Sequence, residues 1–379
     1  MSEKLVAVPS PADLKKLTLD ELTTYCTEVL GLKRFRADQI FQWIYQKQAT
    51  SFDEMTNLPV DVRARLAETA VLHKLAPVNE QRSKDGTIKV LFELHDNHKV
   101  EAVLIPEFFD DGVADRLTVC ISSQVGCMFG CSFCATGMMG YFRNLSIGEI
   151  AGQAIHMDQI ARETYGKRIN NIVYMGMGEP MHNYKAVMHS AAAICHKFGL
   201  GLSPKRITIS TVGLTKQIRQ MADENQPWRL AISLHAANDI KRNRIMPINE
   251  SLDLNSLEEA VRYYYDKTQK DLTYEYLLFD EFNDTRDDAA QLARIAGWAP
   301  SKVNIIMYNN VAGVTLQRAR EHRLNSFLAE LSKRKLLATV RRSRGDDIDA
   351  GCGQLAIREG TERGKTIAAK NKTDGFSAS

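Results

Sequence analysis

The sequence predicts an α/β protein in which a small helical module precedes a mostly parallel sheet, either open or curved into a partial barrel. Six apolar, β-type runs occur between residues 115 and 310, and helical stretches separate most of them. This alternation is typical of repeated βαβ units. The first hundred residues lack it. A chain of 379 residues is long enough for one large domain with a small companion.

The composition is that of a globular protein without a strong overall charge. Hydrophobic residues make up 44% of the chain, and 49 Lys and Arg against 46 Asp and Glu leave a net charge of +3, so a nucleic-acid site must be a local patch. No apolar run approaches the ~18 residues of a membrane span, and the first residues lack an apolar signal segment. Seven cysteines are too sparse for a disulfide scaffold. We therefore expect a cytoplasmic protein with reduced thiols and no membrane partner.

Residues 1–75 are expected to form a helical, helix-hairpin-helix-like accessory domain. Thr18-Leu-Asp-Glu21 and Ser51-Phe-Asp-Glu54 have the spacing of capping boxes, which mark helix starts. Between them, residues 35–45 carry apolar side chains at helical spacing. The sequence therefore predicts a short helical bundle here.

Residues 76–114 are expected to form a β-extension that links this module to the core. Asp85-Gly86 has the composition of a tight turn. Residues 87–94 and 99–106 are strand-like runs around a polar segment, His95-Asp-Asn-His98. This pattern predicts a hairpin.

Residues 115–355 are expected to form the α/β core, and residues 356–379, rich in Lys, Thr, Gly and Ser, a flexible tail. A capping box at Ser146-Ile-Gly-Glu149 begins the best-defined helix. Functional side chains should lie at the carboxyl ends of the strands, where the loops of a parallel sheet gather. The expected strands are Leu117–Ser122, Asn171–Met175, Arg206–Thr211, Leu230–Leu234, Leu272–Leu278 and Val303–Tyr308.

Three closely spaced cysteines, Cys127-Met-Phe-Gly-Cys131-Ser-Phe-Cys134, give the strongest local signal. Three thiolates on one short loop can bind three irons of a [4Fe–4S] cluster and leave the fourth iron open to a small molecule. A structural zinc ion is one alternative, but it needs a fourth ligand, and no Cys or His follows within twenty residues of Cys134. Buried apolar cysteines are the other alternative. We favour the cluster.

Several motifs together resemble a known family. The triad, near the end of the first core strand, resembles the radical S-adenosylmethionine (SAM) superfamily, in which the open iron binds SAM and an electron cleaves it to a 5′-deoxyadenosyl radical. The wider match, over residues 30–355, resembles the RlmN/Cfr family of RNA adenine methyltransferases. It implies a partial (β/α)6 radical SAM barrel with one [4Fe–4S] cluster and S-adenosyl-L-methionine as cofactors. The motifs are Cys120-Ile-Ser-Ser-Gln-Val-Gly-Cys127, Met175-Gly-Met-Gly-Glu-Pro180, Ile207-Thr-Ile-Ser-Thr211, Ile232-Ser-Leu-His235 and Gly345-Asp-Asp-Ile-Asp-Ala-Gly-Cys352-Gly-Gln-Leu355.

The resemblance assigns the SAM contacts to residues at the predicted strand ends. Glycines there let the backbone approach a ligand closely, and a carboxylate can accept hydrogen bonds from the SAM ammonium. Taken alone, the glycine loop is equally consistent with a plain strand-end turn, and the other positions favour a structural role. The implied contacts are Gly178, Glu179, Ser210, Ser233, Leu234, His235 and Asn309.

Two cysteines outside the triad and one carboxylate are the expected catalytic residues. Adenine C2 is too electron-poor to attack the SAM methyl group, whereas a thiolate is a good methyl acceptor. The resemblance assigns this role to Cys352; without its flanking glycines, a buried structural cysteine would be favoured. One SAM methylates Cys352, the radical from a second SAM removes a hydrogen from the S-methyl group, and the methylene adds to C2. Cys120 is expected to resolve the adduct through a transient disulfide with Cys352. Glu101 matches a proton-acceptor position, and a solvent-facing strand residue is its alternative explanation.

Two basic segments are candidate RNA contacts. The run Lys333–Arg344 contains six basic residues and no acidic one, and it leads into the Cys352 loop, so phosphate contacts there would place RNA near the acceptor thiol. A solvated face is the usual explanation of such a run. Lys33, Arg34 and Arg36 form the second segment. We expect the N-terminal module to bind RNA while the barrel acts on a splayed base.

The family contains a C2-methylating (RlmN) and a C8-methylating (Cfr) branch. Arg82-Ser-Lys-Asp-Gly-Thr-Ile-Lys89 and Arg342-Ser-Arg-Gly-Asp-Asp-Ile-Asp349 resemble the C2 branch, whereas Cys134-Ala-Thr-Gly also occurs in the C8 branch and Gly351 stands where Ala is expected. The C2 branch implies an adenosine of 23S rRNA at the peptidyl-transferase centre and the tRNA adenosine 3′ of the anticodon as substrates. It also implies a flavodoxin or ferredoxin as electron donor, and we expect a monomer. The alternatives are a C8 methyltransferase, a non-catalytic iron–sulfur RNA-binding protein and a radical SAM enzyme for a small molecule.

Overall fold

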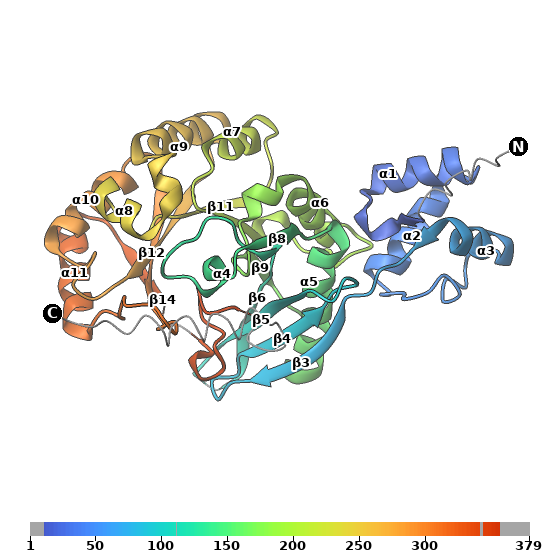
Figure 1. Cartoon of the computed structure of the whole chain (residues 1–379), viewed down its shortest axis with the longest axis horizontal. Coiled ribbons are helices and arrows are strands. Elements are labelled where there is room, and N and C mark those ends of the chain that lie inside the picture. Colours follow the sequence, from blue (N-terminus) through green and yellow to red (C-terminus); the bar gives the residue numbers. More distant parts are fainter. Residues whose placement is uncertain (1–10, 111, 342–343, 357–379) are drawn as a thin grey trace, which may run out of the picture.

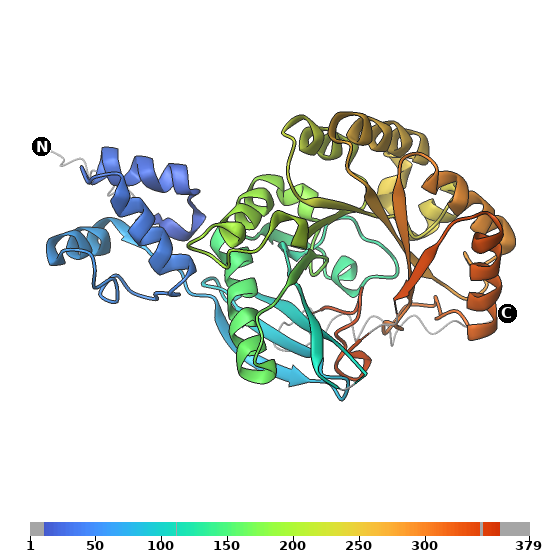
Figure 2. The ribbon, with the colours of Figure 1, turned by 180° about the vertical axis from the view of Figure 1, so that it is seen from behind.

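The structure, a computed structural model, describes residues 11–110, 112–341 and 344–356. Figure 1 shows a helical N-terminal module at one end of the molecule and, beside it, a larger body built on one curved sheet. Helices cover the outer face of this sheet, as the view from behind shows (Figure 2). The expected flexible tail lies outside the described residues except for Ala356.

The N-terminal module is mostly helical. The predicted capping box at Thr18 and Glu21 is confirmed, because the Thr18 hydroxyl accepts a hydrogen bond from the Glu21 N–H and the Glu21 carboxylate accepts one from the Thr18 N–H. The predicted helix over residues 35–45 is also present. The elements are β1 (Ala12–Asp13), a 3-10 turn (Leu14–Lys16), α1 (Leu19–Thr24), a π-helical turn (Tyr25–Val29), α2 (Phe35–Tyr45), α3 (Val60–Thr69) and β2 (Ala70–Val71).

The second predicted capping box, at Ser51 and Glu54, is wrong as a helix start. The Glu54 carboxylate accepts hydrogen bonds from the backbone N–H groups of Thr50 and Ser51. No helix follows directly, and α3 begins only after Pro59. The Glu54 side chain thus closes a local turn. The Ser51 hydroxyl itself donates to the Glu54 carboxylate, whereas in a capping box it would accept a hydrogen bond from the N–H of the third helical residue.

The sheet has ten strands in the described residues, in the order β14-β13-β12-β11-β10-β9-β6-β5-β4-β3. All six predicted core strands are confirmed, and each is parallel to its neighbours among them. A seventh parallel strand, β14, extends this part of the sheet within the basic run. The parallel strands are β6 (Ala114–Cys120), β9 (Asn171–Tyr174), β10 (Ile207–Thr211), β11 (Arg229–Ser233), β12 (Leu272–Leu278), β13 (Ser301–Met307) and β14 (Ala338–Arg341).

The β-extension continues the core sheet. The predicted hairpin is present as β4 (Ile88–Glu93) and β5 (Lys99–Phe108), and β3 (Ala76–Arg82) adds a third antiparallel strand. Strand β5 pairs with β6, with Val103 opposite Cys120. Because of this pairing, side chains of the extension reach the same region as side chains of the core.

Helices connect the parallel strands. The predicted capping box at Ser146 and Glu149 is confirmed at the start of α5, which ends at the left-handed Gly166. The helices of the body are α4 (Ala135–Met138), α5 (Ile147–Tyr165), α6 (Tyr184–Cys195), α7 (Thr215–Asp223), α8 (Asp239–Ile245), α9 (Leu254–Thr268), α10 (Arg286–Ala296) and α11 (Glu321–Lys333). A small separate sheet of β7 (Gln124–Gly126) and β8 (Tyr141–Asn144) flanks the loop that contains α4. Short 3-10 turns cover Pro180–Asn183, Pro204–Arg206, Pro247–Glu250 and Asp346–Ile348.

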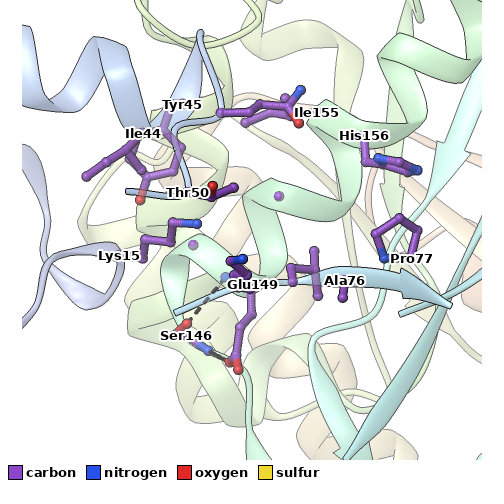
Figure 3. Close-up of a pocket in the computed structure, with 15 residues that line it drawn as sticks. Lys15, Ile44, Tyr45, Thr50, Ala76, Pro77, Ser146, Glu149, Ile155 and His156 are labelled. Atoms are coloured by element: carbon purple, nitrogen blue, oxygen red, sulfur yellow. Dashed lines mark hydrogen bonds between the residues drawn. The ribbon is translucent and has the colours of Figure 1, made fainter. Parts of the chain in front are cut away.

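A cavity of about 280 Å³ lies between the module and α5. Lys15 and Tyr45 line it from the module, and Glu149 and His156 line it from α5 (Figure 3). None of the expected site residues lines this cavity.

Among the residues that the structure describes, no helix is both long and apolar enough to span a bilayer.

Candidate active site

The expected site residues gather at the carboxyl edge of the parallel sheet. Cys120 ends β6 and Ser233 ends β11, while the segment around Glu179 follows β9 and Asn309 follows β13. Parallel neighbours end at the same edge of a sheet, which is where open α/β sheets and barrels bind ligands. This edge is therefore the candidate site.

The three triad cysteines lie on the loop that runs from β7 into α4. All are free thiols, and burial raises the pKa of each, to about 12 for Cys127. Backbone N–H groups nevertheless favour two of the thiolates. Those of Met128 and Phe129 act on Cys127, and those of Thr136 and Gly137 act on Cys134. The negative charges of the Cys134 and Cys127 thiolates raise the pKa of Cys131 further. The loop thus presents three thiols, and backbone donors stand ready for anionic sulfur at Cys127 and Cys134.

This donor set fits an iron–sulfur cluster. Within the described ranges, no three or more His, Cys, Asp or Glu side chains are grouped so that they could hold a metal ion. A single ion needs ligands around one point, whereas each cysteine of a cubane cluster binds a different iron, so the three thiols need not converge. The residues that would hold the cluster are Cys127, Cys131 and Cys134.

The loop after β9 packs directly on the segment that leads into the triad. A Cβ atom on Gly178, whose φ is +96°, would lie 2.4 Å from the Gln124 Cβ, and one on Gly176 would lie 2.7 Å from the Ile121 carbonyl carbon. Glycine is therefore required at both positions. This contact holds Glu179, the next residue, beside the cysteine loop.

Glu179 is buried, with 3% of its surface exposed. Its carboxylate accepts hydrogen bonds from the N–H groups of Met181 (3.0 Å) and Val212 (2.9 Å). Burial raises the pKa of this carboxyl to about 7 in spite of these donors. A cation placed beside it would favour the carboxylate, since an opposite charge stabilises the ionised form.

Ser210, Ser233 and His235 lie at the ends of two adjacent strands. The hydroxyls of Ser210 and Ser233 are 3.2 Å apart. His235 has a φ of +56°, and its Nδ1 accepts a hydrogen bond from the Leu277 N–H (3.1 Å). Burial lowers the pKa of His235 to about 3, so its ring is neutral and carries its proton on Nε2. The ring packs edge-on against Phe133, which precedes Cys134.

Leu234 and Asn283 complete this corner. Leu234 is fully buried, and its N–H donates to the Glu275 carbonyl (3.0 Å). Asn283, which the sequence did not single out, donates from Nδ2 to the carbonyl oxygen of His235 (2.7 Å). The unusual backbone of His235 is thus fixed by a buried amide. A single Asn after the predicted strand Leu272–Leu278 carries no sequence signal for that role.

The loop that carries Cys352 is attached to the triad loop. The N–H of Ala135, directly after Cys134, donates to the Gly353 carbonyl (2.7 Å), and the Thr136 hydroxyl donates to the Leu355 carbonyl (2.6 Å). These two bonds join segments more than two hundred residues apart in the sequence. They place Cys352 beside the residues expected to hold the cluster.

Asn309 also contacts this loop. Its Nδ2 donates to Gln354 Oε1 (3.2 Å), and the same oxygen accepts a hydrogen bond from the Gly351 N–H (2.9 Å). The other amide atom, Asn309 Oδ1, is buried without a partner. A Cβ on Gly351 would lie 2.1 Å from Asn309 Nδ2. Glycine before Cys352 therefore gives the Asn309 amide its space.

Cys352 and Cys120 share one environment. Cys352 is exposed, yet surrounding protein raises the pKa of its thiol by desolvation. Cys120 is buried, and the Cys352 thiolate is the charge that most raises its pKa after desolvation. Arg341 lowers the pKa of both thiols. The two thiols and Arg341 are therefore close enough for their charges to interact.

Glu275 is a site residue that the sequence analysis missed. Its neighbour Tyr276 stacks on Phe327 of α11, so Glu275 faces the opposite, inner face of the sheet. One oxygen accepts from Asn304 Nδ2 (2.9 Å), and the other is buried without a partner. The negative charge of Glu275 raises the pKa of the Cys352 thiol. A lone carboxylate within the apolar run Leu272–Leu278 was the available signal.

Glu101 is buried, so its alternative as a solvent-facing residue is wrong. Its carboxylate lies 3.1 Å from the ammonium of Lys89, which also donates to the Asp349 carbonyl (3.3 Å). Burial raises the pKa of Glu101, and Lys89 opposes the rise. Lys89 thereby joins the β-extension to the loop that carries Cys352.

The basic run does not form one patch. Lys333 and Arg334 lie at the end of α11 and pair with Glu330. They precede β14 and therefore lie at the amino edge of the sheet, opposite the site, whereas Arg341 ends β14 at the carboxyl edge. The expectation that the whole run contacts RNA near the acceptor thiol is thus wrong for its first half. Arg342 lies outside the described residues.

The second basic segment lies at the start of α2 in the module. Arg34 precedes this helix, and Arg36 donates to Gln39 Oε1 (2.7 Å) and to the Asn57 carbonyl (3.3 Å). The guanidinium of Arg36 also stacks on the exposed Phe35 ring. An exposed aromatic ring beside arginine is a surface that an unpaired base can stack on.

Comparisons with known proteins identify the family of this chain. Residues 12–72 match the family described as "Ribosomal RNA large subunit methyltransferase N-terminal domain", and residues 121–293 match the radical SAM superfamily. A "Probable dual-specificity RNA methyltransferase RlmN" from Salinibacter ruber is 47% identical over 91% of this chain and 94% of its own length. A "Dual-specificity RNA methyltransferase RlmN" from Nitratidesulfovibrio vulgaris is 42% identical over 94% of this chain and 98% of its own length.

A solved structure agrees as well. The crystal structure of a radical SAM methyltransferase from Sphaerobacter thermophilus is 43% identical and superimposes with a TM-score of 0.83, covering 91% of this chain and 99% of that one. The predicted α/β radical SAM fold is therefore confirmed. The chain belongs to the RlmN family of radical SAM RNA methyltransferases.

Proposed function

We propose that this enzyme methylates C2 of adenosine, in 23S rRNA at the peptidyl-transferase centre and in tRNA 3′ of the anticodon, by way of a methylated Cys352. The observation that carries the proposal is the attachment of the Cys352 loop to Ala135 and Thr136, directly after the last triad cysteine. An acceptor thiol beside the cluster loop lies where a radical generated there can reach its methyl group.

The strand-end residues are proposed to hold SAM. Glu179 offers a buried carboxylate for the SAM ammonium, and Gly178 gives the backbone room for its approach. Ser210, Ser233 and Leu234 would contact the rest of the molecule, as would the Nε2–H of neutral His235 and the unpartnered Oδ1 of Asn309. A [4Fe–4S] cluster on Cys127, Cys131 and Cys134 would supply the electron that cleaves SAM to a 5′-deoxyadenosyl radical.

Cys352 is proposed to carry the methyl group. Its thiol loses a proton and the sulfur takes the methyl group of a first SAM, which gives a thioether and releases S-adenosylhomocysteine. Loss of one hydrogen from that methyl group, to the radical derived from a second SAM, leaves a methylene radical on the Cys352 sulfur, and this carbon bonds to adenine C2. The protein and the RNA are then joined through Cys352.

Cys120 and Glu101 are proposed to release the product. The C2 proton must leave, and the bond between the Cys352 sulfur and the methylene carbon must break. Cys120, as a thiolate, can attack the Cys352 sulfur as the bond from that sulfur to the methylene carbon breaks. The carbon takes up a proton and becomes the C2 methyl group, the two sulfurs end as a disulfide, and the unpaired electron of the adduct would return to the cluster. A thiol reductant then reopens the disulfide. Cys120 is one candidate for taking the C2 proton, and Glu101, which carries an unpartnered buried oxygen, is the other.

The remaining partners follow from the family. The accessory domain over residues 1–75, with its exposed Phe35 and Arg36, is the proposed RNA-binding part, and residues 76–114 join it to the core. We propose that the enzyme acts as a cytoplasmic monomer with a flavodoxin or ferredoxin as its electron donor. A C8 methyltransferase is the alternative.

Nucleoside analysis tests this function. Reconstituted protein, SAM and a reductant, incubated without oxygen with 23S rRNA or tRNA, are expected to yield 2-methyladenosine after nuclease digestion, with loss of deuterium from RNA labelled at adenine C2. Recovery of 8-methyladenosine with the C2 label intact would establish the alternative. RNA that stays unmodified while SAM is cleaved would contradict both methyltransferase assignments.

A further inference from the structure

Arg242 on α8 is a buried cation that the proposed mechanism does not use. Only 1% of its surface is exposed. Its guanidinium donates to neutral oxygens: the carbonyls of Leu234 (3.2 Å), Val212 (2.6 Å) and Ser233 (3.4 Å), and the side-chain oxygen of Asn249. Neutral acceptors satisfy its N–H groups but leave its charge without a counter-charge.

No carboxylate of the described residues forms a salt bridge with Arg242. Two acidic groups raise the pKa of Arg242 through their charge. The Cys131 thiol has the larger effect and Asp239 the smaller. Asp239 already accepts from the Asn249 amide (2.8 Å) and the Leu254 N–H (3.0 Å). A buried charge without a partner is strongly unfavourable, so a further negative charge is to be expected on the Cys131 side.

Helix α8 lies against the cysteine loop on that side. The N–H of Ser132, between Cys131 and Cys134, donates to the carbonyl of Ile245 at the end of α8 (3.0 Å). Cys131 and Phe133 belong to the same buried apolar cluster as Ile245 and Met246. The helix that carries Arg242 thus also holds the loop expected to carry the cluster.

We propose that Arg242 is a positioning residue whose counter-charge is the anionic iron–sulfur cluster on Cys127, Cys131 and Cys134. The inference rests on the cluster that the proposed function requires. Three thiolates give a [4Fe–4S] cluster a net negative charge, and one-electron reduction adds one more. A nearby buried cation stabilises the reduced form more than the oxidised form and raises the reduction potential.

The same side chain fixes the SAM side of the site. Arg242 donates to the carbonyl of Val212, whose N–H donates to Glu179, and it also donates to the carbonyls of Ser233 and Leu234. One guanidinium therefore ties the ends of β10 and β11 together and connects them to the carboxylate proposed for the SAM ammonium. Loss of the fork geometry should weaken SAM binding by about tenfold, the usual effect of removing an outer-shell partner.

The test separates the charge of Arg242 from its hydrogen bonds. Arg242→Gln removes the charge, Arg242→Lys keeps it without the fork, and Arg244→Gln is the matched control because Arg244 is exposed on the same helix. Cluster content and the midpoint potential are measured by redox titration without SAM. For R242Q we expect at least a tenfold smaller ratio of reduced to oxidised cluster at a fixed potential, equivalent to a negative shift of about 59 mV for one electron. R244Q and R242K should keep the wild-type midpoint, and R242K should bind SAM about tenfold more weakly.

An R242Q midpoint equal to that of R244Q would overturn the proposal. If R242Q does not fold, R242K carries the test, and a tenfold lower ratio of reduced to oxidised cluster in R242K would overturn the proposal. Wild-type protein that takes up no cluster would instead refute the proposed function, so the two failures are distinguishable.

Discussion

Replacement of Cys352 by alanine is expected to abolish RNA methylation while the cluster and SAM cleavage remain. The methyl group reaches adenine only through this sulfur in the proposed mechanism, and the thiol is not among the three expected cluster ligands. Product formation should fall by about a thousandfold or more, the scale of losing a covalent nucleophile. Methylated nucleoside, 5′-deoxyadenosine and protein-bound iron, measured on the same preparation, check this expectation.

Cys195→Ala is the matched control for this variant. Cys195 ends α6 and is half-buried, and burial raises the pKa of its thiol to about 12, so it is a poor nucleophile. This variant should methylate RNA at the wild-type rate. Methylation by the Cys352→Ala protein at more than a few percent of that rate would contradict the role of Cys352 as methyl carrier.

Replacement of Cys120 by alanine is expected to trap the enzyme covalently on its RNA. The steps before resolution need Cys352 and the cluster but not Cys120, so the methylene bridge forms and is not broken. The adduct should accumulate to about one per active enzyme, with free product lowered by about a hundredfold or more. Denaturing electrophoresis of protein incubated with labelled RNA measures the adduct, and nuclease treatment should remove the shift.

Glu101→Gln tests whether Glu101 or Cys120 takes the C2 proton. Glu101 is buried against Lys89, and the amide preserves its shape without its charge. If Glu101 takes the C2 proton, this variant also accumulates the adduct although Cys120 is intact.

Normal turnover by the Cys120→Ala protein, without an adduct, would contradict the disulfide step.

The local patterns of the sequence predicted most of the fold. The six core strands are apolar β-type runs that helices separate, and the Thr18 and Ser146 capping boxes are satisfied within a few residues, so short-range signals were sufficient. Strand β14 was missed because its four residues adjoin basic side chains that dominate the pattern, and only its pairing with β13 makes it a strand.

The site was predicted only in part, because short-range sequence signals identify some of its residues and not the contacts between distant segments. Motifs named the triad, Glu179 and Cys352, and the structure brings them to one edge of the sheet. The attachment of the Cys352 loop to α4, the burial of Glu101 against Lys89, and the position of Arg242 all depend on contacts between distant segments. No local pattern encodes such contacts, and a single buried charge such as Arg242 looks like any other basic helix residue in the sequence.

Mass spectrometry of the peptide that contains Cys352 tests the central claim most directly. Protein with an intact cluster, incubated with SAM and a reductant in the absence of RNA and oxygen, is digested, and the mass of that peptide is compared with that of the Cys195 peptide. The account predicts one added methyl group on Cys352 and none on Cys195. An unmodified Cys352 in protein that cleaves SAM would contradict the methyl-carrier mechanism.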